Sequence, residues 1–178
     1  MAATDLDVFD KTLQTTNIWL DELMADIGPD RQVAWHVLTA VLRALRDRVP
    51  AGLAAHLGAQ LPLIVRGAYY DGYRPGEEPL PIRDLDTFLA HVQEGLNDIR
   101  PVNVRDAVAS VFAILSEHLT RGQCAKVRDA LPEEVRRLWQ LDNGERAPAG
   151  ERAAAGRAAQ NAADARAFQA RRSKERDH

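Results

Sequence analysis

The chain has 178 residues, a formal net charge of −3, and hydrophobic and charged fractions of 46% and 28%. These values are typical of one globular domain or two small ones, and a slightly acidic chain has no strong attraction for nucleic acid or acidic lipid. A single cysteine excludes an internal disulfide, and the lack of an apolar run of about 18 residues excludes a membrane-spanning helix, so we expect a cytoplasmic protein.

Hydrophobic residues recur every three or four positions through residues 5–73, which predicts four helices. The first ends at Gly28-Pro29, the second lies between Asp30 and Pro50, a short third follows, and the fourth opens at Leu61-Pro62. These boundaries are expected because aspartate is a favoured N-cap and proline suits only the first turn of a helix. The apolar face of the first helix consists of Leu6, Phe9, Leu13, Leu20, Leu23, Met24 and Ile27.

The second half of the chain repeats this pattern after a linker. Residues 74–82 contain three prolines and a glycine, which forbid regular structure, and residues 83–140 again predict four helices. Residues 34–69 align without gaps on residues 104–139, with eight identical positions where chance gives about two. We therefore predict an internal duplication within a domain at residues 1–143, with repeat 1 at about 5–73 and repeat 2 at about 83–140. The identical pairs are Val41/Val111, Leu45/Leu115, Gly52/Gly122, Ala55/Ala125, Leu61/Leu131, Pro62/Pro132, Val65/Val135 and Arg66/Arg136.

Residues 144–178 form a tail of different composition, rich in alanine and with a net charge of +3 from eight basic and five acidic residues. Alanine favours helix, but an isolated helix is marginal in water, and Phe168 is the only large apolar residue that could dock this one. We predict that the tail is disordered. The predicted fold class is therefore all-α, with two tandem four-helix repeats packed together and a disordered tail rich in alanine and arginine.

Two segments carry a resemblance to a known family. Residues 60–75 (QLPLIVRGAYYDGYRP) and residues 131–139 (LPEEVRRLW) resemble the bacterial domain-of-unknown-function family numbered 2267, and the likeness extends over about residues 5–140. The resemblance implies a tandem helical repeat in a bacterium. It implies no activity, because the family has no established one.

Ionisable residues form no recognisable catalytic or metal-binding pattern. The five histidines include no pair at helical spacing, and the acidic residues of the first helix lie mainly off its apolar face. Cys124 is expected to be a small buried side chain; the alternative, a reactive thiol near an N-cap at Thr120, lacks an identifiable base. We therefore predict no catalytic residue, no cofactor and no metal, and a protein that is not an enzyme.

The most informative cluster holds all three tyrosines of the chain within five positions. Tyrosine and arginine are typical of protein contact surfaces, so Arg66, Tyr69, Tyr70, Tyr73 and Arg74 are candidate partner-binding residues. The alternative is that Tyr69 and Tyr73 pack the linker against the other repeat.

The favoured function is a non-enzymatic interaction or scaffold module that binds a protein partner or itself through residues 69–74. One alternative is weak nucleic-acid binding through the basic tail, although the acidic body does not favour it. A second alternative is a small-ligand pocket between the repeats.

Overall fold

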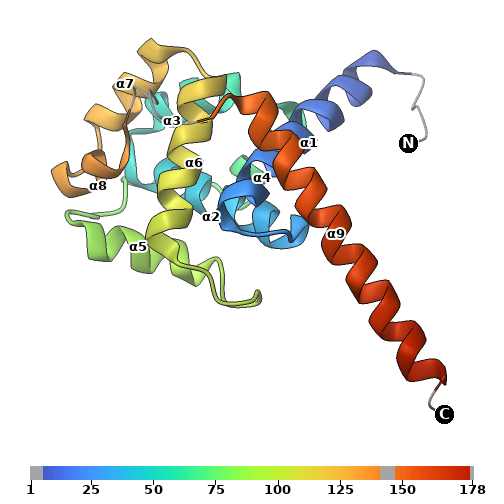
Figure 1. Cartoon of the computed structure of the whole chain (residues 1–178). Coiled ribbons are helices and arrows are strands. Elements are labelled where there is room, and N and C mark those ends of the chain that lie inside the picture. Colours follow the sequence, from blue (N-terminus) through green and yellow to red (C-terminus); the bar gives the residue numbers. More distant parts are fainter. Residues whose placement is uncertain (1–5, 141–146, 177–178) are drawn as a thin grey trace.

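In a computed structural model, the described residues, 6–140 and 147–176, form nine helices and no strand (Figure 1). The prediction of an all-α fold is confirmed. Within the described ranges no helix combines the length and hydrophobicity needed to cross a membrane. The helices are α1 (Asp7–Ile27), α2 (Arg31–Arg48), α3 (Ala51–Gln60), α4 (Leu63–Tyr70), α5 (Leu85–Glu94), α6 (Val104–His118), α7 (Arg121–Asp129), α8 (Glu133–Leu138) and α9 (Ala149–Arg176).

Side-chain caps and prolines set many of the helix boundaries. Asp30 accepts hydrogen bonds from two backbone N–H groups of the first turn of α2, and Asp84 and Asn103 each accept one at the starts of α5 and α6. Pro62 and Pro132 stand immediately before α4 and α8, where a missing N–H costs no intrahelical bond. These ends follow the sequence signals closely.

The core lies around α2 and α6. Their inward faces carry fully buried aliphatic residues such as Leu42 and Leu115, and α2 packs against α1, α4, α5 and α6. Aromatic rings fill the space between α5, α6 and the end of α8, where Phe112 stacks on Trp139 at 4.4 Å between ring centroids. The arrangement buries most of the predicted apolar faces in one contiguous cluster.

The apolar face of α1 is buried along only part of its length. Leu20 and Leu23 are buried, whereas Leu6, Phe9 and Leu13 are 51%, 46% and 39% exposed. The first turns of α1 extend past most of the other helices (Figure 1), and these three side chains stay open to water among the described residues. We call Leu6, Phe9 and Leu13 the α1 stripe.

The prediction of a disordered tail is wrong for residues 149–176, which form α9. This helix crosses α1 at close range and then projects beyond it (Figure 1). The docking does not need large apolar side chains because small residues let the two backbones meet: a Cβ at Gly156 would lie 1.7 Å from the carbonyl oxygen of Asp21. Residues 144–146 and 177–178 of the predicted tail lie outside the described residues.

Candidate functional site

The tyrosine cluster is divided between the core and the surface. Tyr69 is fully buried and its hydroxyl donates to the Ala54 carbonyl at 2.7 Å, and burial raises the pKa of this phenol. The Tyr70 ring packs over Gly58 of α3, where a side chain would collide with it. Tyr73 is half-buried, whereas the Arg74 side chain is 76% exposed. Tyr69 is therefore closed to a partner in this structure, whereas Tyr70 and Tyr73 are partly buried and Arg74 is exposed.

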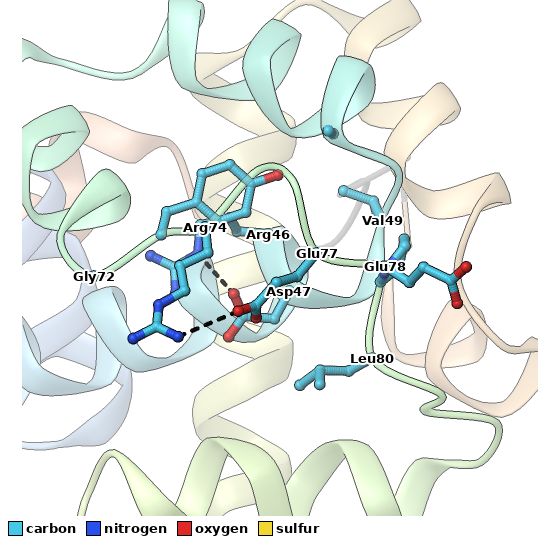
Figure 2. Close-up of a pocket in the computed structure, with 11 residues that line it drawn as sticks. Arg46, Asp47, Val49, Gly72, Arg74, Glu77, Glu78 and Leu80 are labelled. Carbon is cyan, nitrogen blue, oxygen red and sulfur yellow. Dashed lines mark hydrogen bonds and ion pairs between the residues drawn. The ribbon is translucent and has the colours of Figure 1, made fainter.

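Tyr73 and Arg74 line a pocket of about 330 Å³ between the end of α2 and the linker. Figure 2 shows its charged side chains turned toward one another: Arg46 Nε lies 2.7 Å from an Asp47 oxygen, and an Arg74 nitrogen lies 3.2 Å from Glu77. Within the described lining, positive and negative groups thus largely neutralise each other. We call this the linker pocket.

Arg46 and Asp47 anchor the linker to the body. The Arg46 guanidinium donates to the carbonyls of Tyr69 and Asp71 and lies 5.0 Å from the centre of the Tyr73 ring. The Asp47 carbonyl accepts from the backbone N–H of Leu80 at 2.7 Å. Because Arg46 and Asp47 are held by these hydrogen bonds, their role in the linker pocket is structural.

Asp47 also joins the linker region to α5. One of its carboxylate oxygens lies 3.2 Å from Nε2 of His91. Burial would raise the pKa of Asp47, but the hydrogen bonds from His91 and Arg46 and the charge of Arg46 outweigh it and lower the pKa. The same hydrogen bond raises the pKa of His91, against the opposing effect of its partial burial.

Arg66 lies in a different pocket, of about 350 Å³, between α1, the start of α4 and the end of α6. Its guanidinium is held by the carbonyls of Ala59 and Leu61, at 2.9 and 3.0 Å. The apolar lining includes Val8, Trp19, Leu61 and Leu63, and the ionisable lining includes Lys11, Arg66 and His118. We call this the α1–α4 pocket; the structure does not bring Arg66 together with Tyr73 and Arg74.

Behind the α1–α4 pocket lies a buried ionic cluster. Glu22 is fully buried; one carboxylate oxygen lies 2.9 Å from Nε2 of His118, and the other accepts from Arg152 at 2.8 Å. Arg152 also donates to Glu117 at 2.6 Å. The cluster therefore links α1, α6 and α9.

The ionic cluster contains a donor set that suits a metal. Ligand atoms of Glu22, Glu117 and His118 lie within 4.8 Å of one another, as a divalent cation requires. The Arg152 guanidinium already supplies positive charge there, and two of its nitrogens have no hydrogen-bond partner among the described residues. Sequence analysis missed this cluster because its members are far apart in the chain and Arg152 lies in the predicted disordered tail.

Cys124 and the tail complete the residues singled out from the sequence. The Cys124 thiol is buried and donates to the Leu115 carbonyl at 3.4 Å, and burial raises its pKa to about 11. A thiol with so high a pKa is a poor nucleophile at neutral pH. Nucleic-acid binding by the basic residues of α9 stays a prediction.

Comparison of the sequence with known proteins identifies one family. A search of curated proteins finds no match for the chain. A family model matches residues 16–138, which is more than half of the chain and spans α1 to α8 almost completely. The chain therefore belongs to the DUF2267 family, described as an uncharacterized conserved protein.

Proposed function

We propose that the chain is a non-enzymatic, cytoplasmic interaction module and that the α1 stripe binds an amphipathic helix of a protein partner. The observation that carries the proposal is the exposure of Leu6, Phe9 and Leu13 on a projecting helix. A single exposed apolar residue is ordinary, but three in one row leave a continuous apolar surface in water.

The spacing of the α1 stripe favours a helical partner. Leu6 is the N-cap of α1, and the steps of three and four residues that follow place Phe9 and Leu13 on one side of the helix, which is the pattern that packs side chains between two helices. This mode of recognition is a helix held against an apolar face.

The surface around Tyr73 and Arg74 is the second candidate contact. Its charged groups are largely paired with one another, as in Arg74 with Glu77, so a partner gains less by covering it. The exposed Arg74 side chain nevertheless leaves this edge open to a polar contact.

Two matched substitutions distinguish these surfaces. Leu13 and Leu80 are both 39% exposed, the first on the α1 stripe and the second at the linker pocket. Full-length wild type, Leu13→Asp and Leu80→Asp are used as affinity baits in lysate of the native cell, and co-purifying proteins are quantified.

A protein lost with Leu13→Asp and retained with Leu80→Asp supports the α1 stripe. The reverse pattern transfers the contact to the linker pocket. Co-purifying proteins that do not change with Leu13→Asp would contradict the proposal. Light scattering of the purified chain shows whether a partner lost in this way is a second copy.

We also propose that α1–α4 and α5–α8 are tandem copies of one four-helix unit. Matched residues support this: Val41 and Val111 are both fully buried, and Tyr69 and Trp139 are both buried at the ends of α4 and α8. In an experimental structure the two units should superpose helix for helix. A different order or hand of the helices in the second unit would contradict duplication.

A further inference from the structure

We propose that the α1–α4 pocket binds a small amphipathic carboxylate, such as a medium-chain fatty acid. This inference goes beyond the proposed function, because the ligand is a small molecule and the pocket lies on a different face of α1 from the α1 stripe. Val8, Thr12 and Trp19 line the pocket and follow one another at steps of four and seven, about 100–140° around the helix from Leu13.

The walls of the pocket provide an apolar surface. Trp19, Leu61 and Leu63 contribute large apolar side chains, and Pro62 adds a rigid ring between two of them. The Trp19 ring is fixed by stacking on His118, with 5.2 Å between ring centroids. A preformed apolar wall of this kind binds the hydrocarbon part of a ligand without reorganisation.

Two hydrogen-bond donors in the lining residues lack an acceptor. The indole N–H of Trp19 and the Nε–H of Arg66 are buried and have no partner in the described part of the chain. Trp19 is only 2% exposed, so an acceptor atom reaches its N–H only when the neighbouring side chains of the lining shift. Buried donors without partners are rare in folded proteins, and both would be satisfied by a ligand that brings acceptor atoms.

The charge of the pocket selects an anion. Its ionisable lining residues are Lys11, Arg66 and His118, and none of the described lining residues is acidic. Lys11 and Arg66 form no ion pair with the described residues, and the buried Glu22 behind His118 already has His118 and Arg152 as partners. A carboxylate offers both a negative charge and acceptor oxygens for the arginine fork.

The arginine is also positioned in advance. One terminal nitrogen of Arg66 donates to the carbonyls of Ala59 and Leu61, so the guanidinium does not have to be ordered when the ligand binds. Lys11 is exposed on the first turns of α1 and can reach an anion from the mouth of the pocket.

The test uses three ten-carbon probes on the full-length chain, each below its micelle-forming concentration or its solubility limit. Sodium decanoate, decanol and decylamine share the same tail, and their affinities are compared by calorimetry. We expect saturable binding of decanoate that is at least about tenfold tighter than that of either control, because only decanoate matches both the donors and the charge. Equal or tighter binding of decanol or decylamine, or no saturable decanoate binding, would overturn the proposal.

Substitutions then test which residues of the pocket contact the decanoate. Lys11→Met and Arg66→Met should each weaken decanoate binding several-fold, while Arg74→Met in the linker pocket serves as the matched control and should leave it unchanged. Lys11→Met keeps the test valid if Arg66→Met unfolds, since Lys11 is exposed. Decanoate should also shift the indole N–H resonance of Trp19, assigned by its loss in Trp19→Phe. Unchanged affinity in Lys11→Met together with an unmoved Trp19 resonance would refute the assignment.

Discussion

Replacing Gly156 by alanine tests whether α9 is docked on α1. In an isolated helix this change is stabilising, because glycine is about 1 kcal/mol less favourable than alanine in a helix interior. In the docked helix the new methyl group would lie 1.7 Å from the Asp21 carbonyl oxygen and 3.0 Å from the Ala25 backbone nitrogen. Neither is the end of a flexible side chain, so α9 itself has to move.

Together these effects make Gly156→Ala destabilising in the docked helix, although the same change would stabilise an isolated helix. Overpacking costs about 1–3 kcal/mol, and a collision with backbone on both sides belongs at the upper end of that range. Subtracting the gain of about 1 kcal/mol in helix propensity leaves a net loss of about 1–2 kcal/mol. For a chain of this length the loss corresponds to a fall in Tm of about 2–8 °C.

Gly150→Ala is the matched control, since a methyl group there meets nothing within 4 Å in the same helix. It should leave Tm unchanged or raise it. Circular dichroism at 222 nm gives Tm, and amide exchange shows whether protection in α9 falls in Gly156→Ala. If Gly156→Ala stabilises the chain as much as Gly150→Ala does, α9 is not docked on α1.

Three further predictions follow from the packing and charges. Arg152→Met should lower the free energy of unfolding by about 3–5 kcal/mol at pH 7, measured in urea, because it leaves Glu22 buried without its cation. Adding Glu22→Gln should recover part of this loss, and an unchanged urea midpoint in Arg152→Met would refute the ionic cluster. Leu115→Ala should cost about 2–5 kcal/mol in the same assay because the side chain is fully buried. His91 has a raised pKa in the folded protein, so its pairing with Asp47 stabilises the fold fully below the unfolded pKa of about 6.5 and loses this effect as pH rises through the folded value. The difference in unfolding free energy between wild type and His91→Ala, below about 1 kcal/mol, should therefore shrink as pH rises above the folded pKa of His91. A difference that grows with pH would contradict the pairing.

The features that could be predicted from sequence are those decided locally. Asp30, Asp84 and Pro62 act within one turn of chain, and α2, α4 and α5 begin next to them. Thr120 shows the limit of the rule: it precedes α7, but its side chain makes no capping bond and lies beside Gln60 of α3 instead. A cap residue is recognisable from sequence, but a competing tertiary partner is not.

The candidate sites were less predictable because they depend on tertiary placement. Tyr69 and Tyr73 lie four residues apart, yet one is in the core and the other is at the rim of the linker pocket. Arg66 belongs to a pocket completed by Trp19 and His118, which no spacing rule connects to it. Composition suggested a contact surface, but the grouping of the side chains required the fold.

The two ends of α1 show why periodicity alone cannot separate core from contact surface. Leu13 and Leu20 follow the same helical spacing, and the difference in their burial comes entirely from which elements lie opposite. Helix α9 docks beside the second half of α1, through Gly156, and so does not cover the stripe on the first half. An apolar pattern therefore predicts which face of a helix avoids water, whereas the covering element, whether the same chain or a partner, is decided by the rest of the fold. This is the physical basis for placing the partner on the α1 stripe.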